Sequence, residues 1–143
     1  MLNTPPINEI IIGYQYFGGI TTWLNPVGSW PAYSPVKLSQ SKPYWTLAAD
    51  CVCKLNGTWG GAQGGNPPIY DNMPQHHPGD SLVPSGGNQA FVDGSVEWIQ
   101  CERMYYLTTW STTDRIWFFY QDSKDFSPSL LNVLPNLRLT VYR

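Results

Sequence analysis

Residues 86–98 read Gly86-Gly87-Asn88-Gln89-Ala90-Phe91-Val92-Asp93-Gly94-Ser95-Val96-Glu97-Trp98, and this pattern predicts a β-hairpin. Asp-Gly between two runs of alternating apolar residues favours a two-residue type I′ turn, which needs positive φ at both central positions. Taking Asp93-Gly94 as that turn pairs Phe91 with Val96 and Gln89 with Trp98. Because side chains alternate across a strand, Phe91, Val96 and Trp98 are predicted to share the buried face.

The composition favours one β-rich domain. A chain of 143 residues can bury a core of its own. Charged residues make up 13% and aromatic residues 15%, and 13 Gly and 13 Pro punctuate the chain, which indicates short strands joined by loops. The formal net charge of −2 and the lack of a basic run give no support for a nucleic-acid partner.

Further elements are expected on both sides of the hairpin. Strands are predicted at residues 9–17, 45–55, 116–121 and 137–142, where apolar, β-branched and aromatic residues dominate. Asn56-Gly57 is a second turn signal, so Thr58-Trp59 is expected to fold back on the strand before it. Residues 20–43 are expected to be irregular, residues 101–110 a short helix or an extended segment, and residues 127–134 a helical turn.

We therefore predict a mainly β fold, an antiparallel sheet with long loops and one or two short helices, with α+β as the alternative class. Residues 1–7 are interpreted as a linker and residues 8–143 as a single domain. Residues 60–87 form a long segment rich in Gly, Pro, Asn and His. Loops of this length are more often functional or disordered than merely connecting.

Three cysteines, an odd number, leave two interpretations open. Cys51 and Cys53 lie two apart in a predicted strand and point to the same face, so they are poorly placed to bond each other. Either could pair with Cys101, and all three could equally be small buried apolar residues.

The hairpin residues, together with His76-His77 after a proline, resemble the C-terminal signature of bacterial prepilin-type proteins. These are the type II secretion or type IV pilin-like proteins abundant in Planctomycetes and Verrucomicrobia. Weaker matching pieces are Gly13-Tyr14-Gln15-Tyr16, Ser34-Pro35-Val36-Lys37 and Leu47-Ala48-Ala49-Asp50. The resemblance covers residues 10 to 123, although His77 stands further from Asp93 than in the family pattern. It implies a pilin-like globular head, here without the N-terminal helix that anchors such proteins in the membrane.

Several side chains are candidate metal ligands. His76, His77 and Asp80 form the most site-like cluster, because imidazole and carboxylate groups suit zinc. Asp50 and Asp93 are further candidates, and calcium is the alternative ion. Asp93 is also explained by its place in the turn. Asp50 stands in an apolar strand, so it is expected to have a partner.

Trp23, Trp30 and Trp59 lie in predicted loops, where flat aromatic faces could stack on sugars. Other tryptophans, in predicted strands, are expected to fill the core.

From these observations we expect a structural or assembly role, with other pilin-like subunits as partners. We expect an extracytoplasmic location, at the periplasm or cell surface, with an inner-membrane anchor in the full-length form. An extracellular carbohydrate-binding module is the alternative and a hydrolase the third possibility. We do not expect an enzyme, because no nucleophile elbow is present and titratable groups are few.

Overall fold

A computed structural model of the protein describes residues 13–55, 57–59, 84–109, 111–113 and 115–142. Within these ranges the chain is mainly antiparallel β-structure with one short helix, α1 (Pro128–Val133), and several single 3-10 turns. This confirms the predicted mainly β fold. None of the helices in these ranges is long and apolar enough to cross a membrane.

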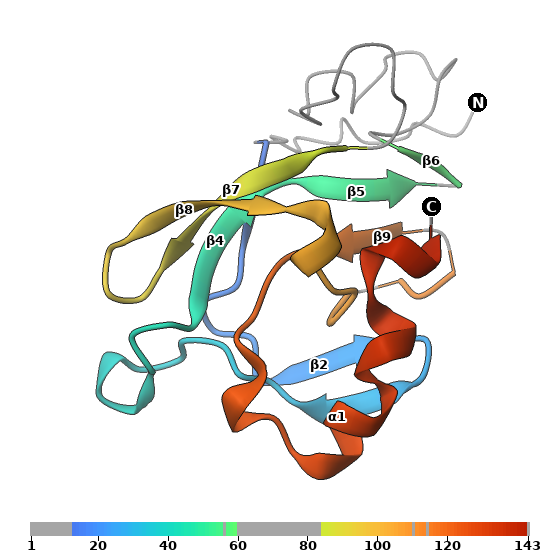
Figure 1. The fold of residues 1–143 in the computed structure, drawn as a ribbon. Helices are drawn as coiled ribbons and strands as arrows, with labels where there is room; N and C mark the ends of the chain where they lie inside the picture. The colour runs from blue at the N-terminus through green and yellow to red at the C-terminus, as the bar shows by residue number, and fades with distance from the viewer. Residues whose placement is uncertain (1–12, 56, 60–83, 110, 114, 143) are drawn as a thin grey trace, which may run out of the picture.

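The described strands form three antiparallel sheets (Figure 1). The largest contains, in spatial order, β1 (Tyr14–Tyr16), β4 (Thr46–Asp50), β7 (Gly86–Phe91) and β8 (Val96–Gln100). The second is the hairpin of β2 (Thr22–Asn25) and β3 (Gly28–Pro31). The third contains β6 (Thr58–Trp59), β5 (Val52–Leu55) and β9 (Arg115–Phe118), with β5 in the middle.

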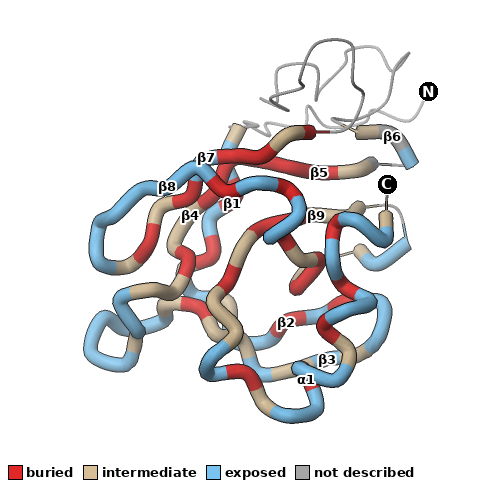
Figure 2. Tube along the Cα trace, viewed as in Figure 1, coloured by how far each residue is buried: buried red, intermediate tan, exposed pale blue. Residues whose placement is uncertain are grey.

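Two groups of buried side chains fill the space between these elements. The first draws on the large sheet, the β2–β3 hairpin and α1, and contains Phe17, Trp23, Ala49, Leu107, Phe119, Phe126, Leu130, Leu134 and Leu137. The second contains Val52, Phe91, Ile99, Cys101, Met104, Tyr106, Phe118 and Leu139. Figure 2 shows the buried segments following β5 and β7 and reaching β2. Burial of this apolar surface supplies the main driving force for the fold.

The predicted hairpin forms, but its turn differs from the prediction. The N–H of Gly94 donates to the carbonyl oxygen of Phe91 at 3.0 Å, and the N–H of Phe91 donates to that of Ser95 at 2.9 Å. The connection is therefore a three-residue loop, a tight turn followed by Gly94 at φ 87°. This is the common alternative to the two-residue type I′ turn.

The extra loop residue shifts the hairpin register by one. Ala90 pairs with Val96 and Asn88 with Trp98. A one-residue slip moves every side chain of a strand to the opposite face. Ile99 is therefore buried in β8, whereas Val96 and Trp98 are exposed, so their predicted burial was wrong.

Residues 20–43 contain a hairpin where an irregular segment was predicted. In β2 and β3, Trp23 lies opposite Trp30, and the Asn25 side chain accepts a hydrogen bond from the N–H of Val27 at 3.1 Å in the turn. The prediction of an irregular segment relied on the prolines, but they do not interrupt the hairpin. Pro26 lies in the turn, and Pro31 is the last residue of β3, an edge strand of this two-stranded sheet. Both positions tolerate proline.

The strand predicted at residues 45–55 is divided at Cys51 into β4 and β5, which belong to different sheets. Trp59 pairs with Lys54, which confirms the fold-back predicted from Asn56-Gly57. Of the strand predicted at residues 9–17, Tyr14–Tyr16 form β1, and residues 9–12 lie outside the described ranges. The division at Cys51 lets one stretch of chain contribute to two sheets.

The C-terminal region is confirmed only in part. Ser127 accepts a hydrogen bond from the N–H of Leu130 at 3.4 Å as the cap of α1, so the helical turn is present. The strand predicted at residues 137–142 is wrong, because Leu134–Leu137 and Leu139–Tyr142 are 3-10 turns. Leu137 and Leu139 are both buried. Two apolar residues at this spacing fit successive turns as well as a strand.

The described part of residues 101–110, residues 101–109, combines both structures that the sequence left open. Cys101–Arg103 form a 3-10 turn, after which Tyr105 is extended and bridges Phe119 and Arg138. The strand predicted at residues 116–121 is present as β9, which ends at Phe118.

All three cysteines are buried thiols, which agrees with the interpretation of them as small core residues. Cys51 and Cys53 lie against Trp117. The hydrogen bond with Cys53, together with burial, raises the pKa of the Cys51 thiol above its ordinary range. A thiol in this state is a poor nucleophile.

Two buried glutamines join the large sheet to the segment after β9. The Gln89 side chain donates to the carbonyl oxygen of Tyr120 at 3.1 Å and accepts from the N–H of Tyr120 at 2.5 Å. The Gln121 side chain accepts from the N–H of Thr46 at 3.0 Å. These amides bond backbone groups as a neighbouring strand would.

Candidate functional site

The predicted metal ligands do not come together in the part of the chain that the structure describes. His76, His77 and Asp80 lie outside the described residues. Asp50 accepts hydrogen bonds from Asn88. Asp93 lies in the hairpin turn, five residues after Asn88 and therefore on the order of 15 Å from it. Among the described residues, no three His, Cys, Asp or Glu side chains are grouped so that they could hold a metal ion.

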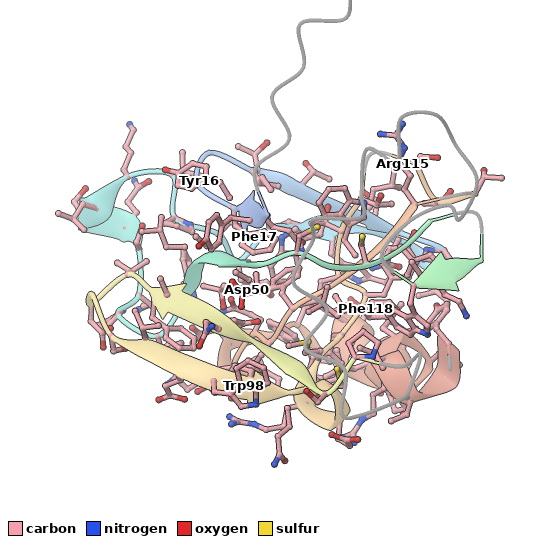
Figure 3. The ribbon with its side chains drawn as sticks, turned by 90° about the horizontal axis from the view of Figure 1, so that it is seen from above. Tyr16, Phe17, Asp50, Trp98, Arg115 and Phe118 are labelled. Carbon is pink, nitrogen blue, oxygen red and sulfur yellow. The ribbon has the colours of Figure 1, made fainter. Side chains whose placement is uncertain are left out.

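Asp50 has the partner that its position demanded. Its side chain is 5% exposed, and Oδ2 accepts hydrogen bonds from the backbone N–H of Asn88 at 2.8 Å and the Asn88 side-chain amide at 3.0 Å. Figure 3 shows Asp50 in the middle of the large sheet. Bonds of this kind offset the desolvation of a buried carboxylate.

Asp93 has a structural role in the turn. Its Oδ1 accepts hydrogen bonds from the N–H of Ser95 at 2.9 Å and from the Ser95 hydroxyl at 2.7 Å. These bonds hold the pKa of Asp93 below its usual value. The turn explains this residue, as the sequence indicated.

The tryptophans proposed as sugar platforms lie in strands rather than loops. Trp23 is in β2 and 1% exposed, so its ring cannot receive a ligand and this assignment was wrong. Trp30, in β3, is half-buried and its indole N–H donates to Ser129. Trp59, in β6, packs on Phe118 with ring centroids 5.5 Å apart. The Trp23 ring is buried because a large aromatic ring supplies core contacts that smaller side chains cannot.

A cleft of about 420 Å³ lies beside β1. Tyr14 and Tyr16 are 61% and 67% exposed at this cleft. The described residues that line it are Tyr14, Gln15, Tyr16, Phe17, Ile20, Thr22, Thr108, Thr109 and Trp117. Its lining is aromatic, aliphatic and hydroxylic, and none of these side chains is charged. The volume is within the range of ligand-binding clefts.

The backbone of β1 opens toward this cleft. The carbonyl oxygen of Gly13 and the N–H of Phe17 each make a 2.9 Å hydrogen bond to β4 or the residue after it. In an antiparallel pair the bonded positions alternate, so the N–H and C=O groups of Tyr14 and Tyr16 point away from β4. Within the described residues β1 is an edge strand, and no other strand pairs with these groups.

A second hollow of about 230 Å³, lined by apolar residues together with Lys37 and Ser41, adjoins the cleft, and Tyr16 borders both. Val36 and Leu38 line this hollow and are 51% and 82% exposed. We call Tyr14, Tyr16, Val36 and Leu38 the β1 face. Single exposed apolar residues are normal on a protein surface, whereas contiguous ones mark interaction sites.

Comparison of the chain with protein-family models, with curated proteins and with solved structures finds no match in any of the three.

No motif in the sequence marks the β1 face as a binding surface. Tyr14 and Tyr16 belong to a predicted strand and to a weaker piece of the prepilin resemblance, and neither role marks them as a binding surface. Their alternation with Gln15 and Phe17, which are buried, was the available signal. It predicts which side chains point outward, but a tyrosine on the outer face of a central strand would give the same pattern.

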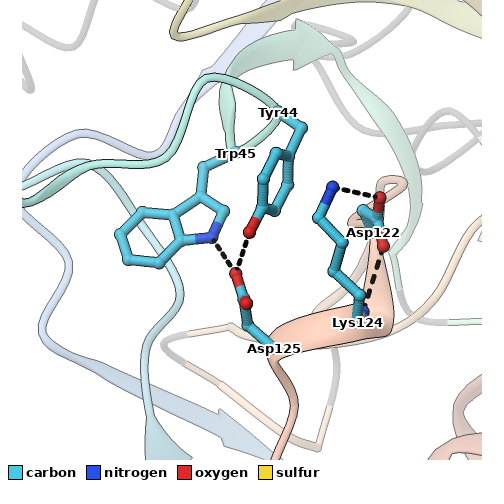
Figure 4. Close-up of polar contacts among 5 residues, drawn as sticks. All are labelled: Tyr44, Trp45, Asp122, Lys124 and Asp125. Carbon is cyan, nitrogen blue, oxygen red and sulfur yellow. Dashed lines mark hydrogen bonds and ion pairs between the residues drawn. The ribbon is translucent and has the colours of Figure 1, made fainter.

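A separate group of polar contacts joins the segment before β4 to the turn at Ser123–Asp125 (Figure 4). The hydroxyl of Tyr44 donates to the Asp125 carboxylate, and the indole N–H of Trp45 donates to the same oxygen at 3.3 Å. The Lys124 ammonium lies 3.0 Å from the centroid of the Tyr44 ring and 3.1 Å from an Asp122 carboxylate oxygen. The bond between Tyr44 and Asp125 lowers the pKa of Asp125 and raises the pKa of Tyr44 to about 12.

Tyr44→Phe is expected to reduce the free energy of unfolding by an amount that depends on pH. Because the pKa of Asp125 is lowered in the folded protein, ionised Asp125 stabilises the fold above about pH 4, the ordinary pKa of an aspartate. This stabilisation is lost as the pH falls through the lowered pKa. The raised pKa of Tyr44 contributes stability below about pH 10, lost as pH rises through about 12. The difference between the two proteins is therefore expected to be constant from about pH 4 to 10 and to shrink on both sides. Urea denaturation at a series of pH values measures it, and a difference that grows below pH 4 contradicts this account.

Proposed function

We propose that this chain is the globular head of a pilin-like or type II secretion pseudopilin-like subunit, which acts through protein–protein contacts outside the inner membrane. The observation that carries this proposal is the β1 face. It places two exposed tyrosines on an edge strand, continuous with exposed Val36 and Leu38.

Covering the β1 face with a partner removes apolar surface from water, which favours association. Removing apolar surface from water stabilises a complex by about 25 cal/mol per Å² before the costs of association are counted. Tyrosine is enriched at protein interfaces because its rigid ring buries a large area and its hydroxyl bonds at the rim. A subunit that assembles with others needs a surface of this kind.

A neutral glycan is the second candidate ligand. The cleft beside β1 combines the rings of Tyr14 and Tyr16 with the hydroxyl groups of threonines, and no charged side chain is among its described lining residues. Aromatic faces and uncharged hydrogen-bonding groups suit a sugar ring. This candidate uses a different set of residues from the tryptophans considered above.

Photo-crosslinking in cells that express the protein tests the assembly proposal. Tyr16 is replaced by p-benzoylphenylalanine, and the matched control carries it in place of Leu131, which is 43% exposed on α1. We expect illumination to join the position-16 protein to another pilin-like subunit, identified by mass spectrometry, and the control to form little of this product. Equal yields at both positions, or products without a pilin-like partner, contradict the proposal.

A further inference from the structure

We propose that β1 binds an extended segment of the partner as an additional β-strand, laid along its exposed edge in the cleft. This inference rests on the proposed function, because it names the partner element that contacts the β1 face. The segment belongs to a second, different subunit and is uncharged where it enters the cleft.

The backbone of β1 offers hydrogen-bonding groups along its outer edge. Tyr14 and Tyr16 each direct one N–H and one C=O away from β4, toward an edge that no described strand occupies. Such an edge is a template for pairing with another chain. Strand addition satisfies all four groups in one register, which contacts between side chains alone cannot do.

The side chains around the edge define the chemistry of the segment. None of the nine described residues that line the cleft is charged, so a buried charge from the partner would have no counter-charge there. Side chains of a strand alternate in direction. The segment is therefore expected to place an uncharged apolar or threonine side chain into the cleft at every second position.

Gln15 adds a polar anchor on the floor of the cleft. It is 6% exposed and lines the cleft. Its Nε2 donates to the carbonyl oxygens of Asp50 at 3.5 Å and Phe118 at 3.4 Å. Because both partners are acceptors, they fix the orientation of the amide and so the position of Oε1, the acceptor that we propose the entering segment bonds. A hydroxyl or amide donor on the segment completes this set.

A peptide titration of the 143-residue chain tests strand addition. The probe is the acetylated and amidated heptapeptide Lys-Thr-Val-Thr-Val-Thr-Lys, and its control is the same peptide N-methylated at alternate residues. We expect saturable shifts of the backbone amide NMR signals of Tyr14, Tyr16 and Thr109 with the first peptide. The methylated peptide is expected to bind at least roughly tenfold more weakly, because it lacks the backbone donors of one strand edge.

Two variants separate backbone pairing from side-chain contact. Tyr16→Pro removes an N–H that points away from β4, so the fold is expected to persist, as an unchanged amide spectrum elsewhere will show. It is expected to weaken peptide binding roughly tenfold. Tyr16→Ala keeps the N–H and is expected to weaken binding less. Leu131→Ser, at an exposed position of α1 outside the cleft and the β1 face, is the matched control and is expected to leave binding unchanged.

Several results would overturn the inference. Equal binding of the methylated peptide, or equal losses in Tyr16→Pro and Tyr16→Ala, would mean that side chains alone make the contact. Shifts of the same amides by cellobiose but not by the peptide would assign the cleft to a glycan. Sedimentation of the chain as a dimer that Tyr16→Pro dissolves would assign the edge to a second copy. If the peptide fails while crosslinks at position 16 form, the assembly role stands and only strand addition is wrong.

Discussion

Trp23→Ala is expected to lower the free energy of unfolding by about 3–5 kcal/mol, the range for removing a buried aromatic ring. The ring is 1% exposed and lies 5.6 Å from Tyr33, 6.0 Å from Phe119 and 5.7 Å from Phe126 between centroids. Its indole N–H donates to the Ser34 hydroxyl at 3.2 Å. Alanine leaves a cavity among three rings and removes this bond. Urea denaturation followed by circular dichroism measures the loss.

The neighbouring residue provides the control. Leu24 is 44% exposed on the same strand, and Leu24→Ala is expected to change the free energy of unfolding by less than about 1 kcal/mol. Trp23→Phe, which keeps an aromatic ring but loses the indole N–H, is expected to fall between the two. If Trp23→Ala were as stable as the unmodified protein and yet lost binding to a glycan, Trp23 would be a ligand platform after all.

Local signals in the sequence predicted the local elements. The Asp93-Gly94 and Asn56-Gly57 turns depend on the conformational preferences of a few adjacent residues, and both hairpins are present. The helical turn predicted at residues 127–134 is likewise present as α1, with Ser127 as its cap. These features depend only on adjacent residues, so a short stretch of sequence is enough to predict them.

Strand register and burial were harder to predict. They depend on differences of a single residue in a turn and on contacts between segments that are far apart in the sequence. Asp-Gly is compatible with a two-residue turn and with a three-residue loop ending in a left-handed glycine, and the structure has the second, with Gly94 at φ 87°. That difference of one residue exposed Val96 and Trp98. The β1 face was missed for another reason. An edge strand is defined by the absence of a neighbour on one side, and the partner of β1 is β4, whose residues follow some thirty positions later.

Gln89→Leu is expected to lower the free energy of unfolding by about 1–3 kcal/mol, because it leaves the N–H of Tyr120 without its partner. The carbonyl oxygen of Tyr120 keeps the hydrogen bond from the Thr46 hydroxyl at 2.6 Å. Gln89 is 1% exposed, and its amide bonds both the carbonyl oxygen and the N–H of Tyr120. Leucine has nearly the same volume, so the loss reports the hydrogen bonds rather than a cavity. Urea denaturation gives the magnitude, and hydrogen exchange of the Tyr120 amide is expected to become faster.

Gln100→Leu is the matched control, since Gln100 is exposed at the end of β8, and it is expected to change stability by less than about 0.5 kcal/mol. Equal losses in both variants would mean that leucine disturbs the sheet wherever it is placed. A small loss in Gln89→Leu with slow exchange at Tyr120 would mean that water or another group bonds that amide. The expected pattern, a larger loss and faster exchange only in Gln89→Leu, would show that the other bonds between the large sheet and the segment after β9 do not replace those of Gln89. That segment directly follows Phe118. The carbonyl oxygen of Phe118 accepts a hydrogen bond from the Gln15 side chain, which lines the cleft beside β1.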